Sequence, residues 1–188
     1  MIIQVRGTSG SGKSTVMRAV MERIGGPWKG VKAEGRKKPL YYKLDKAHPQ
    51  IVVLGHYESA CGGCDTIGSA AQVYELTATL VGALGRAGKY VILQEGLLLS
   101  EDVKWTTQLL DPQVVFLNTP LQRCLTQIKG RRKEAGNEKP LNEANTTNRV
   151  TVIERARTKL IDAGVSTKRC TPEAAPTIII NLIERAFS

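Results

Sequence analysis

Short apolar runs recur along the chain at the spacing expected of β-strands. The first begins at Ile2, and most of the later runs are bounded by Gly, Pro or other turn-forming residues. The runs predict strands at 2–5, 51–54, 90–93, 114–117 and 165–169, with a weaker candidate at 40–44. All of them are far too short to cross a membrane, so we expect no membrane partner.

Amphipathic patterns fill most of the sequence between these runs. Segment 14–24 places Met17, Val20 and Ile24 on one helical face. Similar patterns predict helices at 66–86, 100–110, 120–133 and 147–163, and one more that begins at 171–173. Ser100 is a candidate cap, and Thr119 has the spacing of a capping box with Gln122. A basic stretch, 28–50, and a polar loop, 136–145, are expected to be irregular.

Strands that alternate with crossover helices predict a mainly parallel sheet with helices on both faces, a three-layer α/β/α sandwich. The length of 188 residues fits a single domain over 1–188. Ligands of such sheets bind at the carboxyl ends of the strands. Polar residues follow the predicted strands at 7–14, 55–65, 94–96 and 118–119, so we expect the site at that edge.

The segment 7–14 matches the phosphate-binding motif G-x-x-x-x-G-K-[ST] at every fixed position, after a strand and before a helix. A chance Gly/Ser turn before a helix is the alternative, but such a turn would not be expected to match every fixed position and also lie between a strand and a helix. Backbone N–H groups would surround the phosphates of ATP, Lys13 would reach the β- and γ-phosphates, and Ser14 would ligate Mg²⁺. The residues assigned to nucleotide binding are Gly7, Thr8, Ser9, Gly10, Ser11, Gly12, Lys13, Ser14 and Thr15.

Three carboxylates are candidates for the chemistry that accompanies this motif. Glu95 follows a predicted strand, where it would hold Mg²⁺ through water; an ordinary strand-end carboxylate is the alternative. Asp65 and Glu58 lie in the loop after the second strong strand, and either is a candidate base for the acceptor hydroxyl. Asp65 is also a candidate N-cap for the helix at 66–86.

The same loop contains the sequence Cys61-Gly62-Gly63-Cys64. A redox pair does not suit a phosphate-binding fold, and a zinc site would need a fourth ligand beyond His56. We interpret the segment as a glycine-rich substrate loop and expect free thiols at the cysteines. With no apolar leader before the first strand, we also expect a cytoplasmic location.

Basic residues dominate two further segments. Arg131 and Arg132 close the helix at 120–133, and we predict a lid over 129–146 whose arginines fold over the transferring phosphate, with Arg123 in support; a solvated helix end is the alternative. The net charge of +10 and the interleaved Trp28, Tyr41 and Tyr42 of the stretch 28–50 favour nucleic acid as a partner. A basic soluble surface over buried rings is the alternative.

Together, the phosphate-binding motif, the loop from Gly55 through Tyr57 to Asp65, and the segment from Leu117 to Arg132 resemble phage kinases of DNA hypermodification. The resemblance covers most of the chain. It implies a P-loop NTPase fold of the nucleoside- and nucleotide-kinase kind, and ATP-dependent phosphorylation of the hydroxymethyl group of 5-hydroxymethyluracil, or a related hydroxymethylpyrimidine, in DNA.

Two other functions stay open at this stage. The fourth-strand and lid segment also resembles deoxynucleoside and nucleoside monophosphate kinases, which act on small molecules. The chain lacks the acidic-Arg-Ser signature of deoxynucleoside kinases after the third strand, where Gln94-Glu95-Gly96 stands instead. A nucleotide-binding switch is the other alternative, although the sequence has no Asn-Lys-x-Asp guanine motif. The oligomeric state is open.

Overall fold

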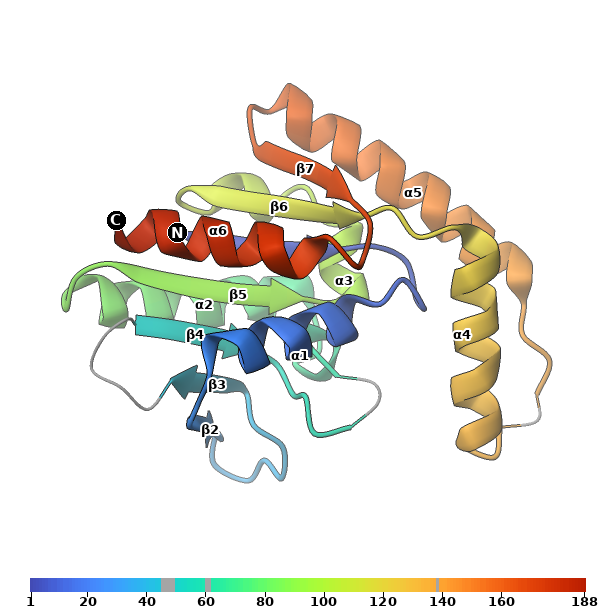
Figure 1. Cartoon of the computed structure of the whole chain (residues 1–188), viewed down its shortest axis with the longest axis horizontal. Helices are drawn as coiled ribbons and strands as arrows, with labels where there is room; N and C mark the ends of the chain where they lie inside the picture. Colours follow the sequence, from blue (N-terminus) through green and yellow to red (C-terminus); the bar gives the residue numbers. More distant parts are fainter. Residues whose placement is uncertain (45–49, 60–61, 138) are drawn as a thin grey trace.

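A seven-stranded sheet forms the centre of the protein, in a computed structural model that describes residues 1–44, 50–59, 62–137 and 139–188 (Figure 1). Its strand order is β2-β3-β4-β5-β1-β6-β7. All neighbours from β4 to β7 are parallel, whereas β2 and β3 are antiparallel to their neighbours. The strands are β1 Ile2–Arg6, β2 Trp28–Val31, β3 Tyr41–Leu44, β4 Gln50–Leu54, β5 Tyr90–Glu95, β6 Pro112–Leu117 and β7 Ser166–Cys170.

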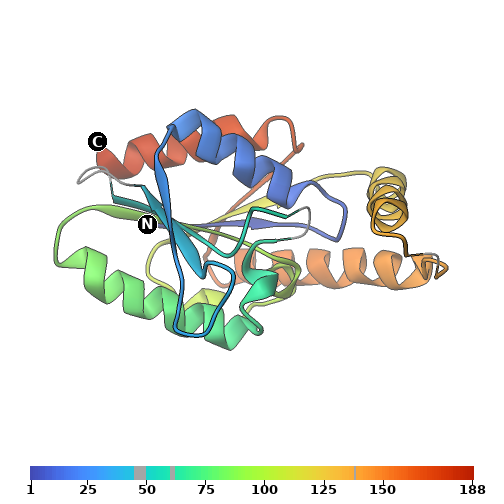
Figure 2. The same cartoon turned by 90° about the horizontal axis from the view of Figure 1, so that it is seen from below.

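Helices cover both faces of the sheet. Figure 2 shows α1 and α6 on one face and α2 and α5 on the other, so the predicted three-layer α/β/α sandwich is confirmed. The helices are α1 Lys13–Ile24, α2 Ala70–Gly85, α3 Leu97–Ser100, α4 Leu121–Glu134, α5 Glu143–Asp162 and α6 Ala175–Phe187, with two short 3₁₀ helices, Cys64–Thr66 and Thr106–Gln108. Within the described ranges, no helix is long and apolar enough to span a membrane.

The core follows from the alternation of side chains along β1. Ile3 and Val5 pack with Met17 of α1 on one face, and Ile2 packs with Val73 of α2 on the other. Successive side chains of a strand point to opposite faces, so both faces of β1 are buried. Gln4 and Arg6 share the Ile2 face, and Arg6 Nε donates to Gln4 Oε1 at 3.2 Å, so these two polar side chains are buried with a partner. This packing holds the carboxyl ends of the strands in one row, which positions the site.

The basic stretch 28–50 is more regular than predicted. β2 and β3 form an antiparallel hairpin that pairs with β4. The Tyr42 ring is only 7% exposed, and the Trp28 indole N–H donates to the carbonyl of Met21 at 3.1 Å. The hairpin therefore presents lysines to solvent and packs these rings inward, which is the alternative that the sequence left open. Residues 45–49 of the stretch lie outside the described residues.

Several predicted helix ends were wrong. Two predicted caps, Ser100 and Thr119, have other hydrogen-bond partners, and two helices are capped by other residues than predicted. Ser100 ends α3 and donates to the carbonyl of Gly96 at 2.8 Å, so no helix fills 100–110. Ser69 caps α2, so this helix begins four residues later than predicted. The Thr119 hydroxyl donates to the carbonyl of Ser11 at 2.8 Å instead of capping α4. Asn142 caps α5, which takes in part of the predicted polar loop.

Candidate active site

The loop between β1 and α1 is the predicted phosphate-binding loop, which we call the cradle. Gly10 and Gly12 have φ values of +75° and +94°, which favour glycine. A methyl group on Gly10 would overlap the carbonyl oxygen of Cys124, so the loop lies directly against α4. The buried hydroxyls of Thr8 and Ser11 have no hydrogen-bond partner among the described residues and are free to donate to a phosphate.

Lys13 is the first residue of α1 and is only 8% exposed. Its Nζ donates to the carbonyls of Gly7 and Thr8, at 2.8 and 3.0 Å. Burial lowers the pKa of this ammonium, and the charges of Glu95 and Asp65 oppose that shift. The lysine is therefore held against the cradle, where its charge is poorly solvated and an anion would stabilise it.

Glu95 ends β5 beside the cradle and is 1% exposed. Its Oε1 accepts a hydrogen bond from Ser14 Oγ at 2.8 Å. Burial raises the pKa of Glu95 to about 7, although Lys13 and the Ser14 hydrogen bond act in the opposite direction. A hydroxyl and a carboxylate oxygen in contact are the hard donors that Mg²⁺ prefers, so this pair fits the predicted ion.

Asp65 and Glu58 have different positions. Both carboxylate oxygens of Asp65 accept backbone N–H groups at the start of α3, from Leu97 at 2.9 Å and Leu98 at 3.0 Å. Asp65 thus ties the loop to α3 and does not cap α2. Glu58 is exposed, and its Oε1 accepts a hydrogen bond from Tyr42 at 3.1 Å. Asp65 borders the cleft beside the cradle and Glu58 does not, which separates the two candidate bases.

One cleft of about 390 Å³ brings most of the predicted site together. Lys13, Ser14, Glu95, Asp65 and Arg131 all border it, and Glu58 and Arg132 do not. Among the described residues, the lining consists of Ser9, Gly10, Ser11, Gly12, Lys13, Ser14, Thr15, Gly62, Asp65, Thr66, Glu95, Leu97, Gln127 and Arg131. A phosphate-sized anion in this cleft would meet a lysine, an arginine and the amides of the cradle.

The two arginines assigned to the predicted lid have different surroundings. Arg131 borders the cleft, whereas Arg132 donates to Asn137 Oδ1 at 3.2 Å and to the carbonyl of Lys139 at 2.6 Å. These acceptors lie in the turn that follows α4 and hold the Arg132 guanidinium there. Of the two arginines predicted to reach the transferring phosphate, Arg131 therefore borders the cleft and Arg132 does not.

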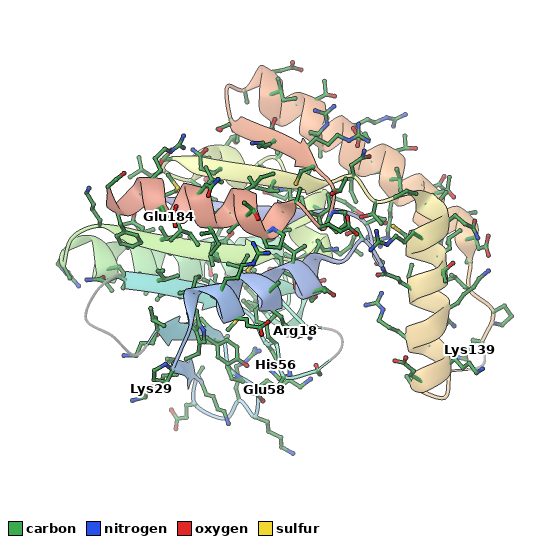
Figure 3. All side chains as sticks on the ribbon, in the orientation of Figure 1. Arg18, Lys29, His56, Glu58, Lys139 and Glu184 are labelled. Carbon is green, nitrogen blue, oxygen red and sulfur yellow. The ribbon has the colours of Figure 1, made fainter. Side chains whose placement is uncertain are left out.

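Arg18 was missed by the sequence analysis. It lies on α1 one turn after Ser14 and donates to the backbone carbonyls of Tyr57 and Ser59 (Figure 3). It therefore ties the loop after β4 to the cradle helix. The available signal was its spacing of four residues from Ser14, which places both side chains on one helical face.

A second cavity, of about 320 Å³, lies behind the cradle. It shares Ser11, Gly12 and Thr15 with the phosphate cleft, and Pro172 contributes to its wall. Arg123, which we expected to support the lid, also borders it and pairs with Glu173 at 2.6 Å. The two cavities are thus neighbours at the loop between β1 and α1.

The cysteine segment is described only in part. Cys64 and Cys124 are buried, Cys170 is partly buried, and all three are free thiols. Cys61 lies outside the described residues. In the part of the chain that the structure describes, no group of three or more His, Cys, Asp or Glu side chains is arranged to hold a metal ion. Gly63, at φ +71°, packs directly on the Glu95 carboxylate.

Comparisons with known proteins identify relatives of the whole chain. No protein-family model matches the sequence. The 5-hmdU DNA kinase of Pseudomonas phage PaMx11 is 40% identical over 97% of both chains. The 5-hmdU DNA kinase of Delftia phage PhiW-14 is 26% identical over 88% of this chain and 66% of that protein.

The fold also has a match among solved structures. Deoxyadenosine kinase from M. mycoides with bound dCTP aligns with a TM-score of 0.50 over 98% of this chain and 100% of that chain. Its 14% identity supports only the shared nucleoside-kinase fold. The identity to the PaMx11 protein over almost the entire chain is decisive for the family. The chain belongs to the family of phage 5-hmdU DNA kinases.

Proposed function

We propose that this kinase transfers the γ-phosphoryl group of ATP to the hydroxymethyl oxygen of 5-hydroxymethyluracil in DNA. The names of its relatives supply the acceptor. The observation that carries the chemistry is the single cleft in which Lys13, Ser14, Glu95, Asp65 and Arg131 meet. These residues come from the cradle, the end of β5, the loop after β4 and the lid.

The donor nucleotide would span the two cavities that meet at the P-loop. Its phosphates would lie in the cradle, and its nucleoside would enter the cavity bordered by Pro172 and the Arg123–Glu173 pair. Ser11, Gly12 and Thr15 border both spaces, which supports a single bound molecule that reaches from one into the other. The cradle's backbone N–H groups and the positive end of α1 favour phosphate at this position.

Ser14 and Glu95 would hold Mg²⁺. When bound, this ion neutralises charge on the β- and γ-phosphate oxygens. Lys13 places its ammonium on the terminal phosphates, and Arg131 stabilises the charge that spreads over the transferring group. Because the cleft is partly closed to water, these fixed charges act more strongly than they would in solvent.

Asp65 is positioned to take the proton of the acceptor. The hydroxymethyl oxygen forms a bond to the γ-phosphorus as the bond to the β–γ bridging oxygen breaks, ADP leaves, and the proton passes to the Asp65 carboxylate. The two amides of α3 fix the orientation of this carboxylate. Phosphoryl transfer through a loose transition state asks little of a base, so positioning is the larger part of the role.

Radiolabelled ATP tests the proposal directly. The protein is incubated with matched oligonucleotides that carry either 5-hydroxymethyluracil or thymine at one position, and with the free nucleoside 5-hydroxymethyldeoxyuridine. Label should enter only the hydroxymethylated DNA, and Lys13→Ala should abolish the transfer. Efficient labelling of the free nucleoside with inert DNA would instead assign the protein as a small-molecule nucleoside kinase.

A further inference from the structure

Helix α4 carries polar residues on two different faces. Gln127 and Arg131, four residues apart, border the phosphate cleft. Lys129, Arg132 and Lys133 lie on another face and border a separate cavity. Residues spaced by three or four share one face of a helix, so the two sets cannot serve the same ligand while α4 keeps this position.

This second cavity, which we call the lid-tip cavity, measures about 330 Å³. It lies between the end of α4 and the turn that leads toward α5, and its lining is strongly basic. Lys129, Arg132, Lys133, Gly136, Asn137, Lys139 and Leu141 border it, and Glu138 lies outside the described residues. The bonds of Arg132 to Asn137 and to the backbone of Lys139 orient its guanidinium within this turn.

Among the described residues, the charges of the lid-tip cavity are only partly balanced by ion pairs. Lys129 pairs with Glu143 at 2.6 Å. Among the described residues, none of the ion pairs includes Arg132, Lys133 or Lys139. Basic residues at the carboxyl end of a helix interact favourably with the helix dipole. Several such charges close together also repel one another, and a bound anion would relieve that repulsion. A concave site with three such cations fits an anion with several oxygen atoms, and a phosphate group matches that description.

The position of the lid-tip cavity suits contact with a DNA acceptor. The far end of α4 and the β2–β3 hairpin project to the same side of the molecule, with the loop after β4 between them (Figures 1 and 2). Lys139 at the lid and Lys29 on the hairpin mark the two sides (Figure 3). A polymer whose base enters the cleft beside Asp65 would extend past this loop, within reach of basic side chains on either side.

We propose that the lid-tip cavity binds a backbone phosphodiester of the DNA acceptor, next to the nucleotide that is phosphorylated. This inference rests on the proposed function and adds a specific contact to it. In this proposal, Arg132 binds the DNA backbone, and its neighbour Arg131 stabilises the charge on the transferring phosphoryl group. Such a contact also favours a polymer over a free nucleoside, which has no flanking phosphate.

A charge-matched pair of triple variants provides the first test. Arg132→Ala/Lys133→Ala/Lys139→Ala removes the cations of the cavity, and Arg155→Ala/Lys159→Ala/Lys168→Ala removes three exposed cations from α5 and β7. The lid-tip variant should raise the KM for DNA about tenfold and flatten its log–log salt dependence by about 0.9 per lost phosphate contact. The kcat at saturating DNA and the KM for ATP should not change, and the control should resemble wild type. A rise in the KM for ATP instead would assign these residues to the donor and overturn the proposal.

Neutral backbone substitutions locate the contact. In oligonucleotides that each carry one methylphosphonate, a single position near the modified base should weaken binding to wild type. The same position should have no further effect on the lid-tip variant. An identical sensitivity profile in both proteins would overturn the proposal. Fluorescence anisotropy measures DNA binding without ATP, so this result does not depend on whether the wild type transfers phosphate. The proposed function is decided separately, by the phosphate-transfer assay.

Discussion

Replacing Glu95 by glutamine should stabilise the protein while removing its activity. Burial raises the pKa of Glu95 from an ordinary 4.5 to about 7. At about 1.4 kcal/mol per tenfold change in proton affinity, ionising this side chain costs about 3 kcal/mol more in the folded protein than in the unfolded chain. The folded state holds the extra proton between those two pKa values, so this cost is absent below about pH 4.5 and complete above about pH 7. Glutamine does not ionise, so the Glu95→Gln variant does not have this cost of ionisation.

Urea unfolding of the metal-free, nucleotide-free protein at pH 5 and pH 8 measures the effect. The free energies of unfolding of wild type and Glu95→Gln should lie close together at pH 5, and the variant should be more stable by up to about 3 kcal/mol at pH 8. Glu184→Gln, on the exposed surface of α6, is the control and should behave as wild type at both pH values. A Glu95→Gln variant that is no more stable than wild type at pH 8 would refute the reasoning. Mg²⁺ should reduce the difference, because a bound cation favours the ionised carboxylate.

Four further predictions concern turnover and substrate binding. Lys13→Ala should abolish transfer and sharply weaken ATP binding, and activity within about threefold of wild type would contradict its role on the phosphates. Asp65→Asn should lower kcat by about 10²–10⁴-fold with ATP affinity retained, whereas Glu58→Gln should be mild; the reverse ranking in steady-state kinetics would exchange their roles. Replacing the three basic residues at 36–38 by alanine should flatten the salt dependence of DNA binding without changing ATP affinity, and an unchanged slope would remove the hairpin from the DNA interface. Gly63→Ala should lower kcat, because its methyl group would overlap the Glu95 carboxylate, and wild-type kinetics would show that the loop tolerates displacement there.

The sequence by itself determined the fold class and the core of the site. Apolar runs separated by amphipathic segments leave few arrangements other than a parallel sheet covered by helices. The motif from Gly7 to Ser14 is local, because its glycines, lysine and hydroxyl act within one loop and one helix turn. Glu95 was identifiable for a related reason: a carboxylate that follows a strand of a parallel sheet lies at the same edge as a loop that follows another of its strands.

The tertiary structure decided everything that depends on side-chain direction and competing partners. Asp65 and Glu58 lie in the same loop, yet only the fold shows that α3 draws one into the cleft and that Tyr42 holds the other on the surface. Arg131 and Arg132 are neighbours in sequence, and one step of about 100° around α4 places them on different faces, toward different ligands. Local sequence patterns identify which side chains are available for binding and catalysis. The hydrogen-bond partners that orient those side chains come from distant parts of the chain, so only the tertiary structure shows them.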